Sequence, residues 1–115
     1  MVNDFSVDEY IDELKSIFND NADEDKAVQM KKYMRDQFKF FGLQAAERRK
    51  LSKELKKKDN RPPHASLSQV IIKLWSEDER ELQYFAMELF ERYKNDFRIG
   101  DIKLMAYMIE NKSWW

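Results

Sequence analysis

One basic stretch of the chain holds the residues with the clearest capacity for chemistry. Seven lysines and arginines lie between positions 45 and 58. At 100° per residue they spread over more than one face of a helix, so several can reach a phosphate backbone while Leu51 and Leu55 face inward. A solvated helix face is the plainer interpretation of such a run. The seven are Arg48, Arg49, Lys50, Lys53, Lys56, Lys57 and Lys58.

The charge of the chain is unevenly distributed, although its formal net charge is only -1. Residues 1–25 contain nine acidic residues and one basic residue, whereas residues 26–61 contain thirteen basic and four acidic residues. The first segment is therefore at -8 and the second at +9. A segment at +9 inside a near-neutral chain is a candidate surface for nucleic acid. An acidic partner is the alternative, including the N-terminal segment of the same or another copy.

The usual catalytic and metal-binding constellations are absent from the sequence. With no cysteine and a single histidine, the chain offers no disulfide and no thiolate metal site, and we expect no cofactor. His64 follows two prolines in the clearest loop, and we interpret it as a surface residue. The apolar runs are too short to cross a membrane, and the N-terminus has no apolar signal core. These features favour a cytoplasmic protein.

Helices must position these groups. A chain of 115 residues has room for one domain, and its two glycines, two prolines and 37% charged residues favour an all-α fold. Ser6 with Glu9 three residues later predicts the first helix start, Gly42 predicts a stop, and Trp75 is expected in the core. The apolar periodicity predicts six helices, over about residues 6–18, 24–37, 45–58, 66–75, 76–93 and 100–109.

The helix starts near residues 6, 44 and 79 recur at a nearly constant interval. This spacing pairs the six helices into about three antiparallel hairpins and is close to the period of a HEAT-type repeat. We therefore predict a HEAT-like α-α superhelix, with a compact helical bundle as the structural alternative.

Several ordered segments between Tyr33 and Trp115 carry the motifs of a known protein family. The run Tyr33 to Gln44, YMRDQFKFFGLQ, is similar to a family segment, and Glu47-Arg48-Arg49 follows at the family's spacing. Leu74-Trp75 and residues 79–86 match the next family segments. Lys112-Ser113-Trp114-Trp115 matches the start of the family motif Ser-Trp-Trp-Asp-x-Val-Asp. Together these segments resemble the AlkD-type DNA alkylation repair enzymes, and the resemblance covers about residues 26–115.

The resemblance implies a superhelical enzyme that excises cationic, N-alkylated purines. It also implies that the concave, basic surface of the superhelix holds duplex DNA. In the family a carboxylate favours the positive charge that develops on the sugar, and tryptophans frame that sugar. Carried over by position, Trp115 lines the catalytic cleft, Tyr33 and Gln44 face DNA, and Arg48 and Arg49 are candidate phosphate contacts.

One departure from the family pattern bears on activity. The family's catalytic aspartate lies four residues after the second tryptophan, and this sequence ends at Trp115. We therefore expect residues 1–115 to be a single helical-repeat domain, the N-terminal half of a larger glycosylase, without activity alone. A helical-repeat interaction module that binds an acidic partner is the alternative. Exposed apolar surface near the C-terminal end also predicts self-association.

Overall fold

The computed structural model describes residues 5–112, and the regular structure in this part of the chain is helical. Two short 3-10 helices, η1 (Lys53–Lys56) and η2 (Lys94–Asp96), follow the third and fifth α-helices. The prediction of an all-α fold with six helices is confirmed. The α-helices are α1 (Val7–Asp20), α2 (Glu24–Tyr33), α3 (Ala45–Ser52), α4 (His64–Trp75), α5 (Arg80–Glu91) and α6 (Ile99–Glu110).

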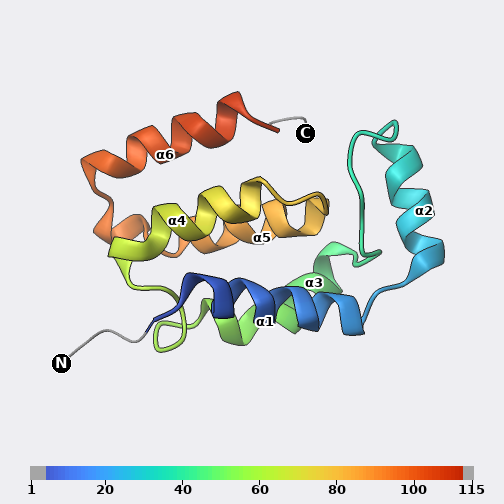
Figure 1. The fold of residues 1–115 in the computed structure, drawn as a ribbon, viewed down its shortest axis with the longest axis horizontal. Coiled ribbons are helices and arrows are strands. Elements are labelled where there is room, and N and C mark those ends of the chain that lie inside the picture. Colours follow the sequence, from blue (N-terminus) through green and yellow to red (C-terminus); the bar gives the residue numbers. More distant parts are fainter. Residues whose placement is uncertain (1–4, 113–115) are drawn as a thin grey trace.

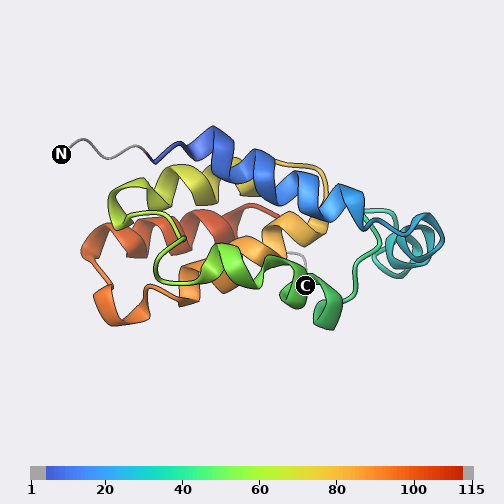
Figure 2. The ribbon, with the colours of Figure 1, turned by 90° about the horizontal axis from the view of Figure 1, so that it is seen from below.

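Five of the helices form two packed layers. Within one layer α4 contacts both α1 and α6, and within the other α3 contacts α5. Between the layers α1 packs on α3, and α4 packs most extensively on α5. Figures 1 and 2 show the chain passing back and forth between the layers, so that successive helix pairs stack along the molecule. This arrangement is the helical-repeat fold expected from the sequence.

The pairing of individual helices differs from the predicted hairpins. The sequence pairs the second helix with the first, but α1 instead packs on α3, and α2 stands at one end of the molecule (Figure 1). No residue of α2 is buried. Its apolar positions are few and α2 buries no complete face, so it does not serve as a repeat helix. We call α2 the arm.

The core lies between α1, α4 and α5, and it contains Trp75 as expected, with only 1% of its surface exposed. The predicted cap of the first helix is also confirmed, because the Ser6 hydroxyl accepts a hydrogen bond from the Glu9 amide at 3.2 Å. Two predicted starts are wrong. Helix α4 begins at His64 rather than at residue 66, and α5 begins at Arg80 rather than at residue 76, because Ser76 is the C-cap of α4.

The arm ends earlier than predicted, at Tyr33 instead of Gln37. Arg35 and Asp36 both have positive φ, 54° and 61°, and this left-handed backbone cannot continue a helix. Residues 38–43, the connector, then lead into α3. Within the connector, Gly42 has a φ of +95°, and a Cβ there would lie 2.0 Å from the Asp23 carbonyl oxygen. Only glycine fits this position.

Within the described residues, none of the helices is both long and apolar enough to span a membrane.

Candidate nucleic-acid interface

A basic groove lies between α3, η1 and α5. Its volume is about 700 Å³. Five basic and two acidic residues line it together with one methionine, which leaves a net charge of +3. The lining residues are Arg49, Lys50, Lys53, Lys56, Met87, Glu88, Glu91 and Arg92. The basic helix predicted from the sequence is therefore one wall of this basic groove.

Glu88 is the electrostatic centre of the basic groove. Its carboxylate accepts hydrogen bonds from Arg48 Nη2 at 2.6 Å, from Arg49 Nε at 2.9 Å and from Lys56 Nζ at 3.0 Å. Burial alone would raise the pKa of the Glu88 carboxyl. The hydrogen bonds from its three basic neighbours outweigh burial and lower this pKa to about 2. Glu88 is therefore ionised at any physiological pH and holds α3 and η1 against α5.

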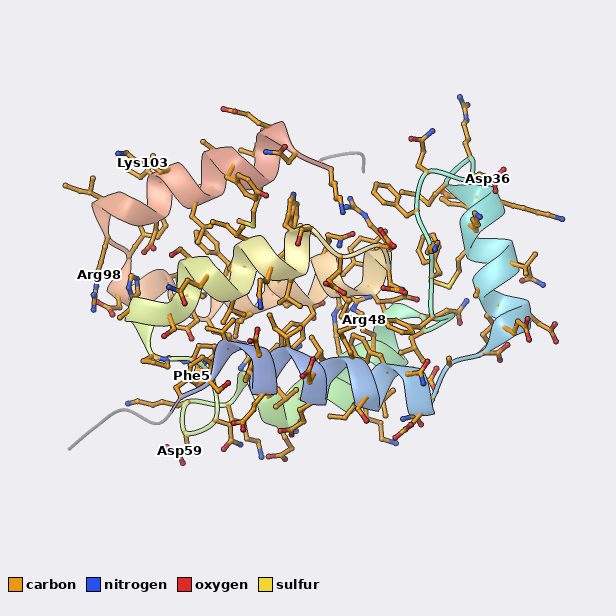
Figure 3. All side chains as sticks on the ribbon, in the orientation of Figure 1. Phe5, Asp36, Arg48, Asp59, Arg98 and Lys103 are labelled. Atoms are coloured by element: carbon orange, nitrogen blue, oxygen red, sulfur yellow. The ribbon has the colours of Figure 1, made fainter. Side chains whose placement is uncertain are left out.

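The three cations on Glu88 are not equivalent. The side chains of Arg48 and Lys56 are only 6% and 4% exposed, whereas that of Arg49 is 62% exposed. Arg48 also lies over the Tyr84 ring, with its guanidinium carbon 5.0 Å from the ring centroid. Figure 3 places the labelled Arg48 in the interior of the molecule. Arg48 and Lys56 are thus buried structural charges, and the expectation of a fully solvated basic helix is wrong for them.

A second hollow of about 530 Å³ lies between the arm, the connector and the last described residue. We call it the end groove. It is lined by Lys31, Asp36, Gln37, Phe38, Lys39, Asp78 and Lys112. The backbone of Lys39 binds the α4–α5 turn on both sides, donating to the Asp78 carbonyl at 3.3 Å and accepting from the Arg80 amide at 2.8 Å. The turn therefore fixes one wall of the end groove.

The connector beside the end groove is held by a buried carboxylate. Glu81 is fully buried, and its two oxygens accept hydrogen bonds from three successive backbone amides. The donors are the amides of Phe41 at 3.0 Å, Gly42 at 2.9 Å and Leu43 at 3.1 Å. Three donors satisfy the carboxylate without a basic side chain, so Glu81 fixes the backbone path from the arm into α3.

The structure separates the site residues predicted from the sequence. Tyr33 is 87% exposed at the end of the arm, and Gln44 is exposed at the N-cap of α3. Arg48 and Arg49 meet at Glu88, on the wall of the basic groove. Trp115 lies outside the described residues. The exposure of Tyr33 excludes a core role for its ring, while contact of these five residues with DNA stays a prediction.

The two carboxylates that organise the connector and the basic groove were missed in the sequence analysis. Glu81 and Glu88 are seven residues apart, which places them on one face of α5. That spacing was visible in the sequence, but their partners come from residues about 40 positions away. Arg92, which lines the basic groove from the C-cap of α5, was also missed because it stands alone outside the basic stretch.

His64 is not the plain surface residue expected from its loop. Its side chain is 15% exposed, and Nε2 lies 2.9 Å from the Asp101 carboxylate at the start of α6. Burial opposes ionisation of Asp101, but the hydrogen bonds from the Arg98 amide and from His64 lower the pKa of its carboxyl. The ring of His64 also meets Tyr93 edge-on. This pair joins α4 to α6, and the part of the chain described here holds no cluster of metal-ligating side chains.

The two-layer stack of helices defines a helical-repeat protein, and comparison with known proteins identifies its family. Residues 14–115 match the family model of the DNA alkylation repair enzymes, and the chain belongs to this family. It is similar to the solved structure of a predicted DNA alkylation repair enzyme from Enterococcus faecalis, with 33% sequence identity and a TM-score of 0.74. That match covers 82% of this chain and 44% of the other, so the matched part of this chain spans less than half the length of its structural relative. No curated protein matches the sequence.

Proposed function

We propose that this chain is the DNA-binding, N-terminal part of a DNA glycosylase that excises cationic, N-alkylated purines from duplex DNA. The family membership supports DNA as the substrate. The basic groove is the observation that carries the proposal, because it concentrates a net charge of +3 in one hollow of the surface. A duplex presents one phosphate charge per about 1.7 Å of axis, and such a groove suits its backbone.

The phosphate contacts are assigned by exposure. Arg49, Lys50, Lys53 and Arg92 are exposed and line the basic groove. Arg49 and Lys53 are four residues apart, on adjacent turns of one face. Arg48, by contrast, is committed to Glu88 inside the fold. We therefore propose Arg49 as a direct phosphate contact and Arg48 as the residue that holds Glu88 and the wall of the basic groove in place.

Fluorescence anisotropy of a labelled duplex tests this assignment. The wild type should bind at low salt, and the double variant Arg49→Gln with Lys53→Gln should bind more weakly. The double variant Lys94→Gln with Lys103→Gln is the matched control, because it removes the same charge from exposed positions outside the basic groove. Equal losses in both variants would refute a specific role for the basic groove. Binding to an acidic protein but not to DNA would favour the interaction-module alternative.

Catalysis is a separate question from binding. The resemblance assigns Trp115 to one wall of the catalytic cleft, and the matching aspartate is not among the 115 residues. We expect the chain to bind alkylated duplex without releasing base, because no carboxylate then stabilises the developing positive charge on the sugar. Release of methylated purine by the purified 115-residue chain would contradict this expectation.

Self-association is proposed from the apolar stripe of α6. Ile99, Ile102 and Ile109 are 83%, 58% and 59% exposed. An antiparallel contact of two α6 helices would bring Ile99 against Ile109 and Arg98 against Glu110 of a second copy, which makes the stripe self-complementary. Sedimentation at rising concentration should show dimers that Ile102→Lys abolishes. A monomer at every concentration would exclude this contact.

A further inference from the structure

Three hydrogen bonds hold the backbone where the chain leaves α6. The Trp75 indole N–H donates to the Asn111 carbonyl, and Arg80 Nη1 donates to the Lys112 carbonyl at 2.7 Å. In return, Lys112 Nζ donates to the Glu77 carbonyl at 2.7 Å. Lys112 itself has a φ of 54°, in the left-handed region that a lysine seldom adopts. The exit of α6 is therefore pinned to the α4–α5 turn in a strained conformation.

The same arginine contacts the connector on its other side. The guanidinium carbon of Arg80 lies 4.2 Å from the centroid of the Phe38 ring and 5.2 Å from that of Tyr84. The Arg80 amide also donates to the Lys39 carbonyl at 2.8 Å. Phe38, Lys39 and Lys112 all line the end groove. One residue thus touches both walls of the end groove.

A fully buried guanidinium is costly, and burial lowers the pKa of Arg80. An apolar side chain of similar volume could fill the same space without this penalty. Such an apolar side chain could neither donate a hydrogen bond to the Lys112 carbonyl nor place a positive charge over the Phe38 ring. The specific gain from arginine at this position is the link between two segments 74 residues apart in sequence.

We propose that Arg80 is a positioning residue that couples the connector after the arm to the exit of α6. Its consequence for DNA rests on the proposed function. The connector lies between Tyr33 and Gln44, and the exit leads into Ser113-Trp114-Trp115. Arg80 therefore links the connector between these two candidate DNA contacts to Lys112, the residue that precedes the motif in the sequence.

Trypsin cleavage after Lys112 tests the coupling in the intact chain without DNA. Cleavage after Lys58, in the exposed turn that follows η1, serves as the internal reference. Arg80→Met should raise the ratio of Lys112 to Lys58 cleavage about tenfold or more, because one charged hydrogen bond that restrains the exit is lost. Phe38→Leu should raise the same ratio, because it removes the ring that packs on the Arg80 guanidinium, and that guanidinium donates to the Lys112 carbonyl.

Two controls separate local release from general destabilisation. Ile71→Val removes one methylene from the core of α4 and should raise both cleavages together, leaving their ratio unchanged. Arg80→Lys keeps the charge but lacks the planar fork, and it should raise the ratio as Arg80→Met does. An unchanged ratio in Phe38→Leu would overturn the coupling. So would a ratio in Ile71→Val that rises as far as in Arg80→Met.

The effect of Arg80 on DNA binding is measured separately, through duplex affinity and its dependence on salt. Arg80→Met should weaken duplex binding without changing the slope of affinity against salt, because no phosphate contact is removed. A reduced slope would make Arg80 a phosphate ligand and overturn its positioning role. If the wild type binds no DNA, the proposed function fails while the protease result still decides the coupling.

Discussion

A glutamate near each end of helix α5 has a different structural role. Near the start of α5, Glu81 accepts from three backbone amides and is fully buried. Near its end, Glu88 accepts from three basic side chains and remains 22% exposed. Backbone donors carry no net charge, so Glu81 fixes a path of the chain. Cationic donors bring charge with them, so Glu88 gathers a basic surface. The partners, and not the carboxylate, decide what each position does.

The largest effect is expected at the connector. Glu81→Gln replaces one acceptor oxygen with an N–H₂ group that faces backbone donors, and it should cost about 3 kcal/mol of folding free energy. Chemical denaturation measures this loss. Glu79→Gln is the matched control, because Glu79 lies two residues away at the N-cap of α5 and its side chain makes no cap hydrogen bond. Similar losses in the two variants would remove Glu81 from its structural role.

A smaller stability loss, with a gain of DNA affinity, is expected at the basic groove. Glu88→Gln leaves the buried charges of Arg48 and Lys56 without a counter-ion. The cost should be about 2 kcal/mol, below that of a fully buried pair, because the Glu88 side chain is 22% exposed to water. It also frees Arg49 and should raise duplex affinity about fivefold, the effect of one charge at about 4 Å in water. Anisotropy and denaturation on the same samples measure both. An affinity that falls in proportion to stability would contradict the separation of the two effects.

Acid should act mainly through Glu88. The pKa of this carboxyl is lowered from 4.5 to about 2 in the folded protein, so its contribution to stability is complete above pH 4.5. The contribution is lost as the pH falls from 4.5 through about 2. Denaturation midpoints across this range should fall steeply for the wild type and less steeply for Glu88→Gln. Parallel curves would show that other carboxylates dominate acid unfolding.

The smallest stability effect is expected for the exposed partner of Glu88. Arg49→Gln should change the folding free energy by less than about 0.5 kcal/mol, because an ion pair with a 62% exposed arginine is largely screened by water. Arg48→Gln, at the buried partner, is the contrasting variant and should cost several times more. Thermal denaturation compares the two. Equal losses of stability in the two variants would mean that burial does not decide how much each cation around Glu88 contributes to stability.

Local signals in the sequence predicted the features that depend on neighbouring residues. The Ser6 cap and the buried Trp75 follow from propensity and periodicity. The helix stop predicted at Gly42 is wrong, because the arm ends at Tyr33 and Gly42 instead lies in the connector. The helical-repeat class followed from helix lengths and short loops. The family resemblance followed from motif spacing, and the family itself is now established by the match over residues 14–115.

The remaining errors come from contacts between distant segments. Arg48 and Lys56 looked solvated because Glu88, 40 and 32 residues further on, is invisible to a helical pattern. His64 looked free because its partner, Asp101, lies on α6. The arm was assigned to a hairpin because its length fits one, although its sparse apolar face cannot support the packing. Tertiary contacts overrode local preference at each of these positions.

The salt dependence of duplex affinity tests the central claim most directly. If the basic groove binds phosphates, the logarithm of the binding constant falls linearly with the logarithm of salt concentration. Removing Arg49 and Lys53 together should make that slope shallower by about 2, one for each lost contact. An unchanged slope in this double variant, or wild-type affinity too weak to measure at low salt, would contradict the account of this chain as the DNA-binding part of an alkylation repair enzyme.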